Sequence, residues 1–208
     1  MKKNYYQHNK IFPTFNRLGF TLIEMVVSLG IIMIISVIFI ANYRNSNRRT
    51  DLIMTAQSLV ADIHAAQNNA LGLVKYGSGV PAGGWGVNFN KTANTYTIFA
   101  DLEAPLEIGN LSFDSATEGD RSLGARQIIF SGEVDIEELK IFSGVGGLTE
   151  TLTDEANVTF LPPDPKTNIY NQLTAATGTA LTVKIKEKNG AGRKTVKINF
   201  LGLIEMID

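Results

Sequence analysis

The sequence of 208 residues carries 19 basic and 20 acidic side chains, is 44% hydrophobic and contains no cysteine. This length and composition allow one membrane segment and one modest globular domain. The lack of cysteine excludes disulfides and thiolate metal sites, so a folded domain must rely on its own apolar core.

The chain begins with a basic segment. Residues 1–16 show neither a helical nor a strand period and are expected to form a flexible leader. Residues 1–19 contain no acid and four bases, which are Lys2, Lys3, Lys10 and Arg17. The rest of the chain therefore has 15 basic and 20 acidic residues, a net charge of −5. The basic flank favours a cytoplasmic N-terminus, but three arginines beyond the apolar run leave the orientation undecided by charge alone.

An apolar run follows, with no charged residue between Met25 and Tyr43. A helix of this length spans the hydrocarbon core of a bilayer. Glu24 stands at the start of the run, where an unpaired charge costs roughly 2 to 3 kcal/mol. A cut between Gly19 and Phe20 would place a new α-amine one helical turn (~6 Å) from this carboxylate, where the two could pair.

An ordinary signal anchor with an incidental glutamate is the alternative. A cleaved signal peptide is disfavoured, because the run exceeds the usual ~7–15 apolar residues and no Ala-x-Ala site follows.

The stretch Gly19-Phe20-Thr21-Leu22-Ile23-Glu24, preceded by Arg17, resembles the processing site of type IV prepilins and type II secretion pseudopilins. The resemblance implies that a prepilin peptidase cuts after Gly19 and N-methylates Phe20, and that Glu24 guides assembly with other pilin or pseudopilin subunits into a helical filament. It also implies an inner-membrane assembly platform as a partner. The implied location is the inner membrane, crossed once, with a cytoplasmic N-terminus and an extracytoplasmic C-terminal domain. The long leader is similar to those of minor, accessory members.

The helical pattern continues beyond Tyr43. Apolar residues recur at steps of four and three, at Leu52, Ala56, Leu59, Ile63, Ala66 and Ala70. One helix from Phe20 to about Leu71 is therefore expected, ended by Gly72 and the glycines that follow. Such a stripe is typical of a packing face rather than of a cofactor site. His64 is the only histidine on this helix, so a histidine pair for catalysis or metal binding has no second member outside the leader.

From Val80 onward the apolar period changes to two, which predicts strands. The expected strands are 85–90, 95–101, 106–113, 127–131, 134–142, 157–161, 181–188, 194–200 and 203–207. Residues 114–126 and 162–178 are expected to be exposed loops. The predicted fold is α+β: a pilin-like fold in which one long N-terminal helix, membrane-spanning in its first half, packs on an antiparallel β-sheet or β-sandwich.

These predictions divide the chain into a cleaved leader (1–19), a transmembrane and filament-core helix (20–43), an amphipathic continuation (44–72) and a β-rich globular domain (73–208). Scattered stretches of that domain resemble the minor subunits related to pseudopilin H. They are Gly84-Trp85-Gly86-Val87, Phe99-Ala100-Asp101, Val158-Thr159-Phe160-Leu161-Pro162, and the strand and turn from Val196 to Gly202. The helix segment Ala65 to Gly72 lacks the Arg-Ser pattern common in those subunits.

Potential catalytic groups do not converge in the sequence. The acidic cluster Glu133, Asp135, Glu137 and Glu138 is expected to form a solvated strand surface, and its spacing does not match a calcium loop. No phosphate loop, nucleophile elbow or paired-carboxylate motif is present. We therefore expect no enzyme activity, cofactor or metal site.

The C-terminal hairpin is strongly basic. Between Leu181 and Phe200 there are six bases and one acid, the bases being Lys184, Lys186, Lys188, Arg193, Lys194 and Lys197. These bases either protect an edge strand or bind DNA, as in some pilus-associated relatives, although no aromatic residue lies between them to stack on nucleotides. Two functions stay open: a structural subunit of a pilus-like or type II secretion filament, and a DNA-binding minor pilin of a competence system.

Overall fold

The computed structural model describes residues 19–77, 79–101, 113, 125–130, 132–144, 147, 149–162, 166–171 and 178–207, and the side chains of these residues except 41, 44, 45 and 166. The chain divides into two compact units, Met1–Tyr43 and Arg44–Asp208. Helix α1, Leu22–Leu71, is one continuous element of 50 residues that contributes to both. It begins two residues after the predicted start at Phe20.

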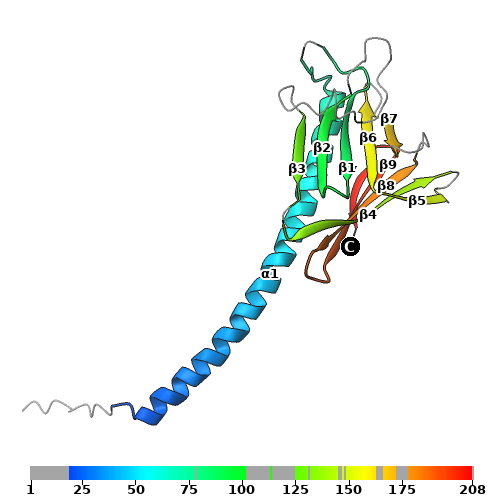
Figure 1. Ribbon diagram of the computed structural model, residues 1–208. Coiled ribbons are helices and arrows are strands. Elements are labelled where there is room, and N and C mark those ends of the chain that lie inside the picture. The colour runs from blue at the N-terminus through cyan, green and yellow to red at the C-terminus, as the bar shows by residue number, and fades with distance from the viewer. Residues whose placement is uncertain are drawn as a thin grey trace, which may run out of the picture. The chain divides into compact units, whose positions relative to one another are not determined.

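The unit Arg44–Asp208 contains two five-stranded sheets (Figure 1). The first has the order β3-β2-β1-β6-β7 and is built from Arg126–Ile129, Thr95–Ala100, Trp85–Asn90, Glu155–Leu161 and Lys166–Tyr170. The second has the order β10-β9-β8-β4-β5 and is built from Ile204–Ile207, Arg193–Asn199, Ala180–Glu187, Val134–Ser143 and Thr149–Thr153. Neighbouring strands pair antiparallel in both sheets. The predicted α+β fold, with a long helix on antiparallel sheets, is confirmed.

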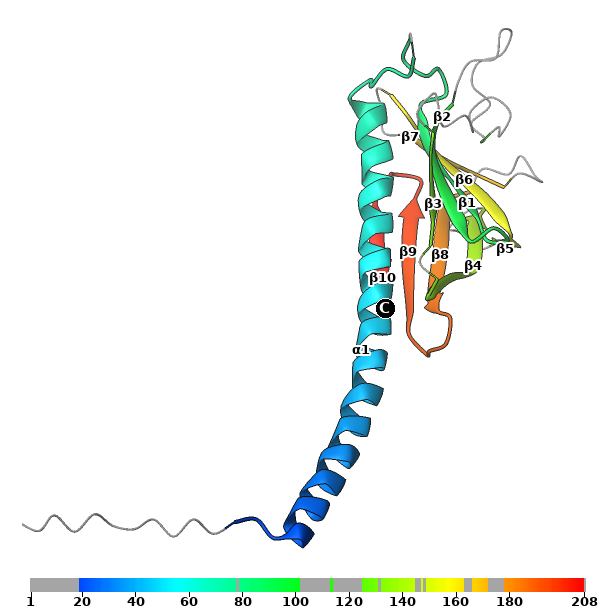
Figure 2. The ribbon, with the colours of Figure 1, turned by 60° about the vertical axis from the view of Figure 1, so that its left-hand side comes forward.

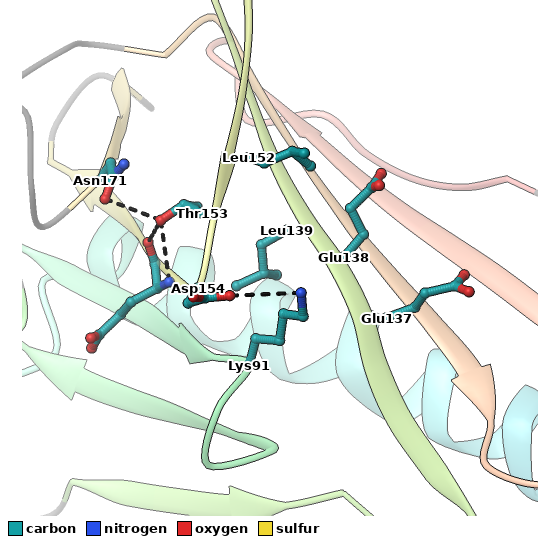
Figure 3. Close-up of a pocket in the computed structure, with 9 residues that line it drawn as sticks. Lys91, Glu137, Glu138, Leu139, Leu152, Thr153, Asp154 and Asn171 are labelled. Atoms are coloured by element: carbon teal, nitrogen blue, oxygen red, sulfur yellow. Dashed lines mark hydrogen bonds and ion pairs between the residues drawn. The ribbon is translucent and has the colours of Figure 1, made fainter.

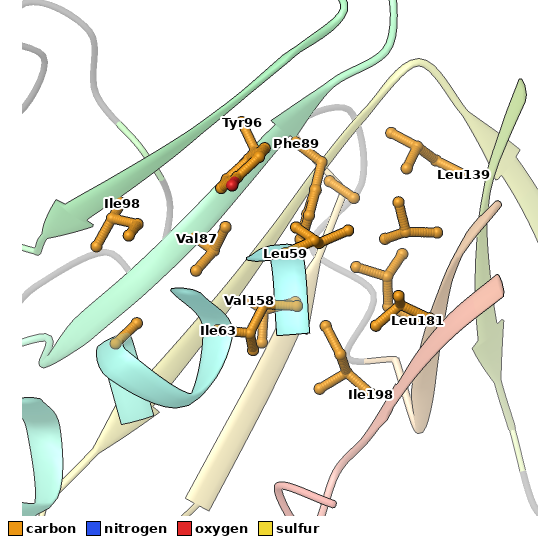
Figure 4. Packing of buried hydrophobic residues seen from close by; sticks show 14 of the residues in the cluster. Leu59, Ile63, Val87, Phe89, Tyr96, Ile98, Leu139, Val158, Leu181 and Ile198 are labelled. Carbon is orange, nitrogen blue, oxygen red and sulfur yellow. The ribbon is translucent and has the colours of Figure 1, made fainter. Parts of the chain in front are cut away.

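The apolar stripe of α1 forms the centre of the core, as the sequence period predicted. All six stripe residues are buried: Leu52, Ala56, Leu59, Ile63, Ala66 and Ala70. In Figure 4, Leu59 and Ile63 lie among Val87 and Val158 of the first sheet and Leu181 and Ile198 of the second. Figure 2 shows β9 running beside the helix, and β10 pairs with β9. Both sheets therefore bury their inner faces in one core that they share with α1.

Polar side chains join α1 to the strands at the margins of this core. The Tyr96 hydroxyl donates a hydrogen bond to Asp62 (2.7 Å), and the Arg126 guanidinium pairs with the same carboxylate. Burial, together with the Asp62 carboxylate, raises the pKa of Tyr96. The Gln67 amide donates to the carbonyl of Gly202 in the β9–β10 turn (3.0 Å). These bonds fix where each sheet meets the helix.

Two sequence-based assignments need correction. Residues 162–178 were expected to form an exposed loop, but β7 occupies Lys166–Tyr170, pairs with β6 and buries Ile169 completely. Strand β5 was not predicted because its side chains are mostly exposed and, apart from Leu152, polar, as expected at a sheet edge. The expected strand 106–113 and most of the expected loop 114–126 lie outside the described residues.

The helix ends in a left-handed turn at Leu73 rather than at a glycine. Leu73 has a φ of 50°, and the Val74 amide donates to the Asn69 carbonyl (2.9 Å) across the turn. This is the hydrogen bond of a Schellman motif. Gly72, the predicted terminator, lies one position earlier. A leucine in this conformation costs roughly 1 kcal/mol.

Replacing Leu73 with asparagine should raise the free energy of unfolding by up to about 1 kcal/mol, because asparagine tolerates the left-handed conformation. Leu73 is 51% exposed, so little burial is lost. Urea unfolding of the detergent-solubilised protein measures the change. The matched control is Leu71→Asn, at a helical position of similar exposure (45%), which should lower stability. A similar loss in both variants would contradict a strained turn.

Candidate functional site

The N-terminal part of α1 is apolar on every side. Within the described residues, one helix segment, Leu22–Ile40, is long and apolar enough to cross a membrane, and none of it is buried within the protein. A helix that exposes apolar side chains all round requires an apolar environment. Ser28 and Ser36 donate their hydroxyls to the carbonyls of Glu24 and Ile32 (both 2.7 Å), so these polar groups are satisfied within the helix.

Thr21 and Glu24 form a capping box at the start of α1. The Glu24 carboxylate accepts hydrogen bonds from the backbone amide (2.8 Å) and the hydroxyl (2.9 Å) of Thr21. The amide of Glu24 in turn donates to the Thr21 hydroxyl (3.3 Å). This reciprocal pattern satisfies amides that helix formation leaves without partners. Glu24 was expected to have no partner in the uncut chain, but it has a polar partner in Thr21.

Gly19 and Phe20 precede the helix and are exposed. Neither residue is helical, and the Phe20 side chain is 81% exposed. The peptide bond between them therefore lies outside the hydrogen-bonded part of α1. The geometry combines an accessible Gly-Phe junction, a capped helix start and an apolar helix of membrane-spanning length.

Residues 14–40 match the family described as the prokaryotic N-terminal methylation motif. This match supports a protein of the type IV pilin and pseudopilin type. The motif implies processing by a prepilin peptidase and assembly with other pilin subunits, and together with the apolar helix it fits a protein anchored in the inner membrane. No curated protein and no solved structure matches the chain. The family match does not reach the stretches that resemble pseudopilin H.

The bases of the C-terminal hairpin do not form one surface. Lys184 and Lys186 alternate with buried residues of β8 and face outward, as the sequence predicted. Lys194 lies on the same side of β9 as the buried Val196 and Ile198, whereas Lys188 is exposed in the turn. Four of the six bases share the outward face: Lys184, Lys186, Arg193 and Lys197.

The outward-facing bases lie beside the acidic cluster of β4. Lys184 is in register with Glu138 and Lys186 with Asp135, next to a bulge in β4. Glu137 pairs with both Lys184 (3.4 Å) and Arg193 (2.9 Å). Hydrogen bonding from Arg193, supported by Lys184, lowers the pKa of Glu137, and Glu137 raises the pKa of Arg193. Of the four acids predicted to form a solvated surface, Glu137 is instead ion-paired with the hairpin, whereas Glu133 pairs with Arg48 of α1 and Glu138 with Lys140.

The proposed edge protection by the lysines is wrong. Strand β8 lies between β9 and β4, and β9 lies between β10 and β8, so the edges of this sheet are β10 and β5. The sequence could not reveal this, because the pairing of β8 with β4 joins residues 38 to 53 positions apart. The available hint of this pairing was that β4 carries mainly acids and β8 mainly bases.

A hollow of about 530 Å³ lies between the β4–β5 hairpin and the β1–β2 turn (Figure 3). Its acids all have partners: Lys91 pairs with Asp154 (3.6 Å), Lys140 with Glu138 (3.3 Å), and the Asn88 amide donates to Glu155 (2.9 Å). Lys140 also pairs with Glu150 (3.2 Å), and the two carboxylates raise the pKa of Lys140. Within the described residues, no three His, Asp or Glu side chains are grouped to hold a metal ion.

The paired state of Glu137 generates a pH-dependent prediction. At pH 7, Glu137→Gln should lower the free energy of unfolding by no more than about 1 kcal/mol. Because folding lowers the pKa of Glu137, its contribution is complete above the ordinary value of 4.5 and is lost as the pH falls through the folded value. Urea unfolding of parent and variant at several pH values should therefore converge in acid. The control Glu205→Gln lies on the same face but outside these ion pairs, so its stability should not converge with that of the parent in acid. A stability difference between Glu137→Gln and the parent that stays constant with pH would refute the pairing.

Proposed function

We propose that the protein is a minor structural subunit of a type IV pilus-like or type II secretion pseudopilus filament. A prepilin peptidase removes residues 1–19 and N-methylates Phe20; residues 20–43 form the membrane and filament-core helix, and 44–72 continue it. Residues 73–208 form an extracytoplasmic globular domain. The observation that carries the proposal is the family motif coupled to the capped apolar helix. The inner-membrane assembly platform is the further partner.

The alternative, a DNA-binding minor pilin, receives less support. DNA affinity depends on bases that are free to neutralise phosphates. In the hairpin, Lys184 and Arg193 are engaged by Glu137, and Asp135 and Glu138 stand opposite Lys186 and Lys184. The face that would meet the nucleic acid is thus close to charge balance. This arrangement favours the structural role.

Processing provides the direct test. The peptidase should cut between Gly19 and Phe20, so the mature protein extracted from a host with the enzyme should begin at a methylated Phe20 by intact-mass analysis. Gly19→Arg should leave the full-length chain in the membrane, because a long charged side chain replaces the small residue next to the scissile bond. A parent protein that retains residues 1–19 would contradict the proposal.

Glu24 has two separable roles, helix capping and charge pairing. Glu24→Gln keeps an oxygen that can accept from the Thr21 amide but removes the charge available to the Phe20 α-amine. Thr21→Val keeps the charge and removes the hydroxyl bond. We expect Glu24→Gln to insert and be processed normally yet enter filaments poorly, and Thr21→Val to assemble.

The measurement compares the sheared filament fraction with the membrane fraction for both variants. Equal incorporation of Glu24→Gln and the parent would rule out the charge as the assembly determinant. A defect confined to Thr21→Val would assign the role of Glu24 to helix capping instead.

A further inference from the structure

A second hollow, of about 520 Å³, lies at the end of the second sheet where β9 turns into β10. Its described lining is Phe142, Gly147, Thr179, Ala180, Lys197, Asn199 and Phe200. Hollows of this size commonly bind small ligands or peptide side chains. It shares no lining residue with the hollow of Figure 3, and all of its lining lies within the unit Arg44–Asp208.

The lining combines apolar walls with groups that donate hydrogen bonds. Phe142 and Phe200 supply aromatic rings, and Phe200 is 53% exposed. The Asn199 side-chain oxygen is occupied, since it accepts bonds from the amides of Leu201 (3.0 Å) and Leu203 (2.9 Å). That bonding leaves the Nδ2 group of Asn199 as the donor toward a ligand. The Thr179 hydroxyl donates to the Phe142 carbonyl (3.1 Å), and this bond holds the two lining residues together.

Lys197 supplies the charge of this hollow. Unlike Lys184 and Arg193, it forms no ion pair with any residue that the structure describes. Glu205 of β10 stands opposite it in register, without reaching ion-pair distance. An exposed acid in this position would compete with an external carboxylate for Lys197. A cationic amine and an amide donor beside two phenyl rings fit a ligand that carries a carboxylate next to an apolar group.

The apolar surface continues outside the hollow. Leu201 and Leu203, which flank Gly202 in the same turn, are 66% and 53% exposed. A small organic acid would fill the hollow and leave these side chains uncovered, whereas an extended peptide would cover both. We propose that this surface is a docking site for a partner peptide segment in which an apolar side chain adjoins an aspartate or glutamate. The carboxylate binds Lys197 and Asn199, and the apolar side chain enters between Phe142 and Phe200.

The test uses the full-length, ¹⁵N-labelled protein in detergent micelles. The probe is a five-residue peptide, glycine-phenylalanine-glutamate-leucine-glycine, with blocked ends, and the observable is the amide shifts of Thr179, Lys197 and Phe200 during titration. We expect saturable shifts at these residues. Exchanging the glutamate of the peptide for glutamine should weaken binding about fivefold, the upper range for a partly exposed ion pair. Exchanging its phenylalanine for alanine should weaken binding about tenfold.

Protein variants separate the site from general effects of the micelle. Lys197→Met keeps the aliphatic stem and should reproduce the fivefold loss, whereas Lys188→Met, in the exposed turn, should have no effect. Glu205→Gln should tighten binding, because it removes the competing carboxylate. Equal affinity for the glutamate and glutamine peptides, or shifts elsewhere than at the hollow, would overturn the proposal, as would binding of 3-phenylpropanoate without binding of the peptide. None of these outcomes bears on filament assembly, which is read from processing and incorporation.

Discussion

The folded unit depends on the burial of one face of α1 against the two sheets. Each large side chain of that face, such as Leu59 or Ile63, contributes roughly 1.5–3 kcal/mol of apolar burial. The alanines at positions 56, 66 and 70 allow strand side chains to approach the helix closely. The inner faces of the two sheets are covered by the same stripe, so neither sheet has a complete core without the helix. The polar bonds of Asp62 and Gln67 add specific contacts between the helix and each sheet at the margins of this core.

The sequence was most informative where structure is local. The stripe of α1, the hairpin of β1 and β2, and the alternation in β8 follow from side-chain period, because burial of one face imposes that period. Strands β5 and β7 were not predicted. Strand β5 is an exposed edge, and β7 follows prolines that indicate a loop. The Thr21–Glu24 capping box was readable from its Thr-x-x-Glu spacing but was overlooked. The ion pairs of Glu137 were not predictable, because strand order is a non-local property.

The charges on the outward face of the second sheet favour one pairing and one register of its strands. Strands β8 and β9 place Lys186 directly opposite Arg193, and such like-charged neighbours repel each other. The acids of β4 offset this repulsion on the other side of β8. The bulge between Ile136 and Glu138 presents two successive glutamates toward that side. A one-residue slip of β4 would break the opposite-charge pairs and turn its apolar residues outward, so charge and apolar pattern specify the same register.

The capping box also determines how α1 responds to a break in the chain upstream of it. The first amide that needs a side-chain acceptor is that of Thr21, and its acceptor, Glu24, lies downstream. Every hydrogen bond that defines the helix start is thus contained in residues 21–25. Scission of the Gly19–Phe20 bond would remove none of them. The helix would therefore keep its capped start if the residues before Phe20 were removed.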